Sequence, residues 1–254
     1  MGEQRVKRIE SPKNERVKQW KKLLTKKERE KTGLFLVEGF HLVEEALKSN
    51  IVELLILAET KAIPTSWKVD HIPMVIVTEA VIGELSDTET PQGIVAVCKH
   101  LHWNVDSVQT VLFIDAVQDP GNLGTIIRTA DAAGIDAVVV GEGSVDIYNA
   151  KVIRATQGSL FHFPVIKGDI GQWIAHFQNR HIPIYGTSLQ NGVDYRSVSP
   201  SSSFALIVGN EGSGVNDKWL QQTTANLYVP IYGQAESLNV AVATGILLYN
   251  LQKK

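Results

Sequence analysis

The chain has 254 residues, is 44% hydrophobic and carries a formal net charge of −2, so it is long enough for one large or two modest domains, and its overall charge does not indicate a nucleic-acid partner. Its one cysteine, Cys98, excludes a disulfide framework and a cysteine-based zinc site. No apolar run approaches a membrane span and the lysine-rich start has no signal-peptide pattern, so we expect a cytoplasmic protein with no membrane partner.

The charge is distributed unevenly along the chain. Residues 1–31 contain twelve Lys or Arg against five Glu, a net of +7, whereas the remaining 223 residues carry −9. Such a basic arm is typical of proteins that bind a polyanion, although a solvated helix face without a partner is the alternative. Apolar residues at helical spacing predict one helix over 13–30. The alternative is an arm that becomes ordered only when the polyanion binds.

The first half of the chain alternates short apolar runs with amphipathic segments. We expect strands over 34–37, 52–58, 75–77 and 93–98, and helices over 39–49 and 79–85. This alternation predicts a compact α/β domain that ends near residue 99 together with the basic arm. Residues 100–107 are polar and are predicted to be a linker.

Residues 108–254 are predicted to form a second α/β domain. We expect strands over 111–116, 137–141, 182–187, 204–209 and 227–231, and helices at about 123–133, 149–158, 169–180, 215–222 and 238–251. The strands are almost continuously apolar, which indicates a parallel sheet covered on both faces. Ligands of such sheets bind at the carboxyl ends of the strands.

Three segments of this domain each read strand, Gly-rich turn, helix. They are Val111–Asp136, with the turn Pro-Gly-Asn-Leu-Gly, then Ala205–Val215, with Gly-Asn-Glu-Gly-Ser-Gly, and Asn226–Lys254, with Glu-Ser-Leu-Asn before its helix. Taken singly, each is more often an ordinary βα connection. In order and spacing the three resemble the motifs of the SpoU (TrmH-type) RNA 2′-O-ribose methyltransferases, a branch of the SPOUT methyltransferases.

The resemblance implies a fold for both domains. It implies a small N-terminal ribosomal-protein-like α/β domain that engages RNA, whose opening resembles Phe35–Leu47, and a C-terminal SPOUT α/β domain with a deep trefoil knot. Knots are rare exceptions to chain topology, so this one rests on the resemblance alone. It also implies a homodimer, for which the apolar helix Leu238–Leu251 and the Trp219 region are candidate interfaces or plain core.

The resemblance also assigns roles to individual residues. The residues expected to serve catalysis are Arg128, Asn122, Glu211, Ser237 and Asn239. The residues expected to contact S-adenosylmethionine are Gly209, Val229, Ile231, Leu238 and Thr187. Asn122 is expected to orient a ribose or phosphate, and Glu211 to hold the site together. Read singly, Glu211 could be an acid at a helix N-terminus, Ser237 an ordinary cap and Asn239 a solvated group. Arg128 could pair with a surface acid.

Arg128 is the residue expected nearest the reacting hydroxyl. The family assigns this arginine a catalytic role, sometimes as the base. Because a guanidinium is effectively never deprotonated in proteins, we expect Arg128 to bind the phosphate next to the target ribose and to stabilise the forming alkoxide. A phosphate oxygen or water would then accept the proton.

Other classes of site fail on detail. The turn after the first motif strand lacks GxGxxG, the Gly209–Gly214 turn lacks the Lys-Ser/Thr of a P-loop, and the seven His show no metal-ligand spacing. We therefore expect no metal. The resemblance implies transfer of a methyl group from S-adenosylmethionine to a ribose 2′-oxygen. Because the basic arm and the substrate-binding domain resemble those of the ribosomal RNA enzymes of the family, the expected substrate is 23S ribosomal RNA. Transfer RNA as substrate, or a non-catalytic ribosome-assembly factor, are the alternatives.

Overall fold

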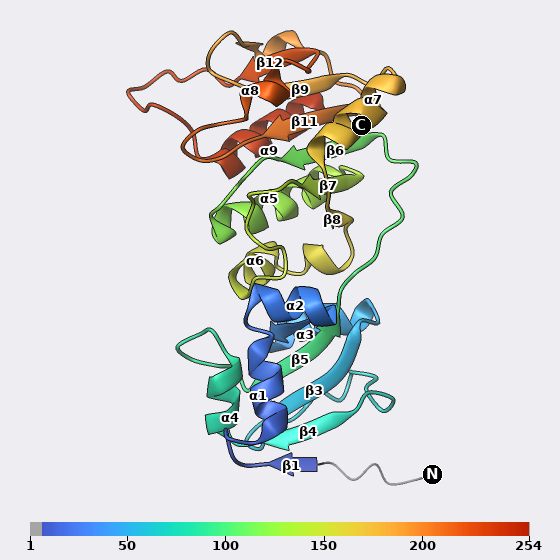
Figure 1. Cartoon of the computed structure of the whole chain (residues 1–254), viewed down its shortest axis with the longest axis vertical. Helices are drawn as coiled ribbons and strands as arrows, with labels where there is room; N and C mark the ends of the chain where they lie inside the picture. The colour runs from blue at the N-terminus through green and yellow to red at the C-terminus, as the bar shows by residue number, and fades with distance from the viewer. Residues whose placement is uncertain (1–6, 254) are drawn as a thin grey trace. The chain divides into compact units, whose positions relative to one another are not determined.

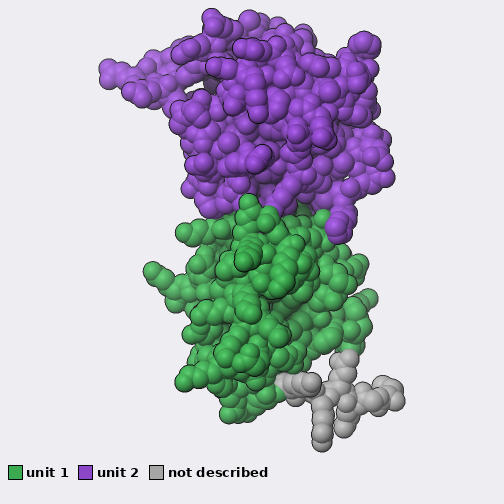
Figure 2. All heavy atoms as spheres, viewed as in Figure 1, with its two compact units in different colours: residues 1–101, 148–161 green, residues 102–147, 162–254 purple. Residues whose placement is uncertain are grey.

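The computed structural model describes residues 7–253, which form two compact units (Figures 1 and 2). Unit 1 contains the chain up to Leu101 and also Tyr148–Phe161, and unit 2 contains His102–Ile147 and His162–Lys254. The first boundary falls inside the expected linker. The inclusion of Tyr148–Phe161 in unit 1 departs from the expectation of an uninterrupted domain over 108–254. The first six residues of the basic arm, Arg5 among them, lie outside the described residues.

Unit 1 is built on a mixed five-stranded sheet in the order β1-β4-β3-β5-β2. Strand β5 is antiparallel to β2 and β3, while β4 is parallel to β1 and β3. The strands are β1 (Lys7–Ile9), β2 (Leu34–Glu38), β3 (Val52–Ala58), β4 (Met74–Val77) and β5 (Ile94–Lys99). Its helices are α1 (Glu15–Lys22), α2 (Lys26–Thr32), α3 (Phe40–Lys48), α4 (Glu79–Leu85), α6 (Ala150–Thr156) and the 3-10 turn η1 (Ser159–Phe161).

The described part of the basic arm is folded. The alternative that the arm becomes ordered only when RNA binds is therefore wrong for these residues. The single helix predicted over 13–30 is in fact two helices. Asn14 caps α1 through its side chain, and α1 ends at Leu23 before Thr25 starts α2. Val17, Trp20 and Leu23 are buried in the same core cluster as strands of the sheet. Burial of this apolar face holds the arm in place without a partner.

Tyr148–Phe161 joins unit 1 through aromatic packing and specific hydrogen bonds. The ring of Tyr148 stacks on His100, with centroids 4.1 Å apart, and lies 4.4 Å from Phe35. The hydroxyl of Ser49 donates to the carbonyl of Phe161 over 2.7 Å. Through these contacts, residues from the second half of the chain form part of the core of unit 1.

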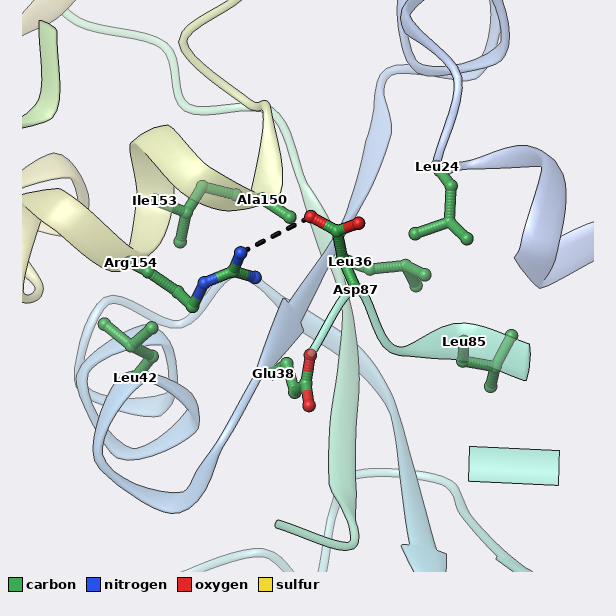
Figure 3. A pocket seen from close by; sticks show the side chains of 9 residues that line it. All are labelled: Leu24, Leu36, Glu38, Leu42, Leu85, Asp87, Ala150, Ile153 and Arg154. Atoms are coloured by element: carbon green, nitrogen blue, oxygen red, sulfur yellow. Dashed lines mark hydrogen bonds and ion pairs between the residues drawn. The ribbon is translucent and has the colours of Figure 1, made fainter. Parts of the chain in front are cut away.

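A small cavity lies beside this segment (Figure 3). Leucines line much of it, and Arg154 on α6 pairs with Asp87 at 3.4 Å across its wall. At about 20 Å³ it has room for roughly one water molecule and is too small for a cofactor.

Unit 2 contains a seven-stranded sheet in the order β10-β12-β9-β11-β6-β7-β8, and every strand pair in it is parallel. The predicted α/β fold with a parallel sheet is confirmed. The strands are β6 (Thr110–Ile114), β7 (Ala137–Val140), β8 (Val165–Lys167), β9 (Ile184–Thr187), β10 (Val193–Asp194), β11 (Phe204–Val208) and β12 (Ala225–Tyr228). The helices are α5 (Pro120–Ala133), α7 (Ile170–Asn179), α8 (Asp217–Leu220), α9 (Val240–Leu251) and the 3-10 turn η2 (Tyr195–Ser197).

Several boundaries in unit 2 differ from the sequence predictions. Helix α5 begins at Pro120, three residues early, because Asp119 caps it and proline suits the first helical position. Strand β12 ends at Tyr228, so Val229 and Ile231 follow it instead of belonging to it. Strands β8 and β10 were not predicted. The trefoil knot stays a prediction of the family resemblance. None of the helices in residues 7–253 is long and apolar enough to cross a bilayer.

Candidate functional site

The three sequence motifs meet at one edge of the sheet in unit 2. Strands β12, β9, β11 and β6 are consecutive neighbours and parallel, so their carboxyl ends lie together. We call residues 115–119, which connect β6 to α5, the corner, and residues 229–238, which connect β12 to α9, the motif-three segment. Thr187 ends β9, and Gly209 directly follows β11. The residues expected to bind the cofactor therefore come from neighbouring strand ends.

Glu211 connects the second motif to the first. One carboxylate oxygen accepts a hydrogen bond from the backbone N–H of Gln118 at 3.2 Å, and the other accepts from the N–H of Asp119 at 3.1 Å and from Nδ2 of Asn122 at 3.1 Å. The carboxylate thus lies at the N-terminus of the 14-residue helix α5, where unpaired N–H groups and the helix dipole favour a negative charge.

Asn122 connects the first motif to the third. Its Oδ1 accepts from Nδ2 of Asn239 at 2.9 Å, and Oδ1 of Asn239 in turn caps α9 by accepting from the N–H groups of Ala241 and Val242. Because both ends of the Asn122 amide are engaged, its arrangement fits a residue that aligns the two helix starts better than one devoted to a ribose or phosphate. Glu211, Asn122 and Asn239 form one continuous hydrogen-bonded chain.

The environment of Glu211 lowers its pKa from the ordinary value of 4.5. Partial burial by itself raises the pKa, but hydrogen bonds from its own backbone N–H, from Asn122 and from the amides of Asp119 and Gln118 outweigh that effect. The carboxylate is therefore ionised at neutral pH, which is the state that can accept these bonds.

Arg128 lies two turns into α5, with an exposed side chain. Its side chain makes no hydrogen bond or ion pair with the described residues, so the alternative that it simply pairs with a surface acid finds no support there. An exposed guanidinium whose donors are available suits an anionic ligand such as a phosphate.

Gly209 sits where no larger residue fits. A Cβ at this position would overlap the backbone N of Val215 and the carbonyl of Gly214. The loop closes on itself through paired backbone hydrogen bonds of 3.0 Å and 2.9 Å between Asn210 and Gly214. Gly209 is buried, and its own N–H and C=O make no hydrogen bond with the described residues. Such free backbone groups at a strand end fit the polar edge of an adenine ring.

The motif-three segment differs from the corner, whose Gln118 and Asp119 amides donate to Glu211. Its backbone N–H and C=O groups make no hydrogen bond within residues 7–253. Ser237 is exposed and Leu238 is 37% exposed, while Val229 and Ile231 are half-buried. The segment therefore supplies an apolar wall at its start and free polar groups near α9, as expected for a ligand site.

Sequence reasoning missed three residues that build this site. Asp115 is the first residue of the corner, and its carboxylate accepts hydrogen bonds from the N–H of Asn216 at 2.7 Å and from Trp219 Nε1 at 3.3 Å. Asp119 caps α5 by accepting from the N–H of Asn122, and Asn210 bonds the carbonyl of Ala116. The Asp-Pro-Gly start of α5 is a recognisable cap signal, whereas the partners of Asp115 and Asn210 have none in the sequence.

Comparisons with known proteins agree with this geometry. Residues 109–249 match the SpoU rRNA Methylase family, and residues 14–96 match the MRM3-like substrate binding domain. The chain belongs to the SpoU rRNA methylase family. The predicted membership, the methyltransferase class and S-adenosylmethionine as cofactor are thereby confirmed.

Relatives of this SpoU family member extend over both units. The 23S rRNA (guanosine(2553)-2′-O)-methyltransferase RlmP of Bacillus subtilis is 52% identical over 97% of this chain and all of its own. An AdoMet-bound rRNA methyltransferase from Sinorhizobium meliloti superposes with a TM-score of 0.86 at 32% identity, covering 96% of this chain and 97% of the other. AviRb from Streptomyces viridochromogenes, also with AdoMet, gives 0.84 at 26% identity, covering 94% and 97%.

Proposed function

We propose that this protein methylates the ribose 2′-oxygen of a guanosine in 23S ribosomal RNA, the substrate named for its Bacillus subtilis relative. The observation that carries the proposal is 52% identity across both units, including the substrate-binding region, and not merely across the catalytic motifs. A ribosomal RNA substrate implies that the protein works in the cytoplasm.

In this proposal Arg128 binds the RNA phosphate beside the target ribose. Its exposed, unengaged guanidinium supports that role, and its permanent charge would stabilise the oxyanion that forms as the 2′-hydroxyl loses its proton. A phosphate oxygen or a water molecule accepts the proton. Ser237 and Asn239, at the start of α9, lie on the motif that would border the reacting ribose.

Gly209, Val229, Ile231, Leu238 and Thr187 would hold S-adenosylmethionine, which supplies an already activated methyl group. These residues bind through backbone groups and apolar side chains, so their contribution is to orient the methyl group for in-line attack and to exclude water. The hydrogen bonds that join Glu211, Asn122 and Asn239 keep the N-termini of α5 and α9 aligned around that position.

The active form is proposed to be a homodimer. Helix α9 packs along α5, and it leaves Val242 54% exposed and Tyr249 58% exposed. Large apolar side chains grouped on one helix face favour a second copy of the chain as their cover. Arg128, exposed on the adjacent α5, would then lie near that interface. The Trp219 region is less suited, since Trp219 packs against its own core.

Unit 1 is proposed to recognise the RNA, with the basic arm supplying positive charge. Several arm cations are already paired with acids, as Lys18 is with Glu15 at 2.7 Å and Lys31 is with Glu28 at 3.5 Å. Lys13, Lys22 and Lys27 have no ion pair with the described residues and are exposed, so they are the better candidates for phosphate contacts. No group of three metal-ligating residues converges in the described part of the chain; absence of a metal stays a prediction.

The test is transfer of labelled methyl from S-adenosylmethionine to total RNA from cells that lack the protein, with Arg128→Ala as control. Label in 23S RNA as 2′-O-methylguanosine, lost in the variant, is expected. Label in transfer RNA would move the protein to that substrate. RNA binding without incorporation into any fraction would instead support the non-catalytic assembly factor.

A further inference from the structure

The corner contains a residue in an uncommon backbone conformation. Ala116 has φ of +57°, in the left-handed region that alanine rarely occupies because its Cβ crowds the backbone. A contact from elsewhere in the fold must therefore stabilise Ala116 in this conformation. Its carbonyl accepts a bond from Nδ2 of Asn210 at 2.9 Å.

Both polar atoms of the Asn210 side chain make hydrogen bonds. Its Oδ1 accepts from the backbone N–H groups of Gly212 at 2.9 Å and Ser213 at 3.1 Å, while Nδ2 faces the carbonyl of Ala116. Reversing the amide would turn donors toward donors, so these contacts specify its orientation. The residue thus ties its own loop to the corner.

The next residue, Glu211, binds the same corner two and three residues further on. Its carboxylate accepts from the N–H groups of Gln118 and Asp119, which follow the left-handed turn at Ala116 directly. Two consecutive residues of the second motif therefore hold consecutive parts of the corner.

We propose that Asn210 is a positioning residue for methyl transfer: it holds Ala116 in the left-handed conformation, so that the corner presents its amides to Glu211 and thereby aligns Asn122 and Asn239. Its role in catalysis rests on the proposed function. Its role in shaping the corner does not, and the two are measured separately.

Asn210→Asp is the informative substitution. It keeps an oxygen for Gly212 and Ser213, but it replaces the donor to Ala116 with a second acceptor, which repels the carbonyl. Ala116→Gly is the matching rescue, because glycine adopts positive φ without the hydrogen bond, and its wider range of ψ lets its carbonyl turn away from the new carboxylate. Asn250→Asp is the control, since Nδ2 of Asn250 likewise donates to a backbone carbonyl, that of Tyr195 at 3.0 Å, away from the site.

Two quantities are measured: hydrogen exchange of the 115–122 peptide, and binding of S-adenosylmethionine by calorimetry. They are compared for the unaltered full-length chain, the three single variants, and the double variant that combines Asn210→Asp with Ala116→Gly. Asn210→Asp is expected to speed exchange of the Gln118 and Asp119 amides by about tenfold or more and to weaken binding by about tenfold, and the double variant to recover both to within about threefold. Asn250→Asp should leave both within about twofold.

The proposal is overturned if Asn210→Asp behaves like Asn250→Asp, or if adding Ala116→Gly recovers neither quantity. Circular dichroism checks that each variant is folded, and Asn210→Ala with and without Ala116→Gly repeats the comparison should the aspartate variant unfold. If the unaltered protein shows no methyl transfer, the proposed function is contradicted. The role of Asn210 in the corner is not, because hydrogen exchange measures that role independently.

Discussion

The corner and the motif-three segment border the same site, but they are built in opposite ways. The corner is held by the side chains of Asn210 and Glu211 from the second motif and by its own Asp115. Its Asp115, Gln118 and Asp119 amides already donate hydrogen bonds. The motif-three segment makes no backbone hydrogen bonds among the described residues. One side of the site is therefore arranged before any ligand binds, and the other is free to order around ligand or a second copy.

The difference fits the chemistry proposed for the site. A preorganised side need not pay for rearrangement when charge develops, whereas an open side lets cofactor and RNA enter. We expect substitutions in the corner to change stability and ligand binding together, and substitutions in the open part to change ligand binding or association with little effect on folding.

The largest effect is expected at Arg128, which is part of neither structural network. Arg128→Ala should lower kcat/KM for RNA by about 100-fold or more, because one charged contact to the developing oxyanion is lost, while the Kd for S-adenosylmethionine stays within about threefold. Methyl-transfer kinetics and calorimetry measure the two. Arg128→Lys keeps the charge and loses the fork; near-normal turnover of that variant would contradict the bidentate contact.

Gly209 and Gly233 compare the two regions directly. Gly209→Ala should lower the Tm by about 5 °C or more and weaken cofactor binding, because the added methyl overlaps the Gly214–Val215 backbone. Gly233→Ala in the motif-three segment meets no atom within 4 Å and should shift the Tm by about 1 °C at most. Scanning calorimetry gives both values, and equal shifts would remove the distinction between the regions.

The exposed face of α9 tests the proposed dimer. Val242→Glu should convert the dimer to monomer in light scattering, because it places a charge in an apolar contact, and the Tm measured on the monomer should be little affected since Val242 is 54% exposed. Val193→Glu, at a valine that is 44% exposed on β10, is the matched control. A protein that is already monomeric before substitution would refute the dimer.

A smaller effect than at Arg128 or Gly209 is expected from Glu211→Gln, measured as a free energy of unfolding in urea. At neutral pH the variant should be less stable by about 1 kcal/mol, kept small because the carboxylate is solvent-accessible. The folded pKa is lowered from 4.5, so the stabilisation is fully present above that pH and is lost as the pH falls through the lowered value. A difference that grows in acid would contradict the assigned hydrogen bonds.

Much of the fold could be predicted from local pattern. The almost continuously apolar strands β6 and β11 and the amphipathic helix α3 can be recognised from patterns that extend over only a few residues. Strands β8 and β10 have only three and two residues, too few to establish a period. A helix was expected over 149–158 and α6 is there, but nothing in its sequence indicated that it would complete the core of unit 1.

The sequence by itself determined the family, the longer strands and helices, and the residues that carry the motifs, because those depend on residue type and spacing. Tertiary structure decided which groups they bond. Glu211 receives its hydrogen bonds from amides up to 93 positions earlier, Asn122 joins Asn239 117 positions later, and Arg128 is left without a bond in the described chain. Such partners are specified only when parallel strands bring their carboxyl ends to one edge, and no local pattern encodes which strands become neighbours.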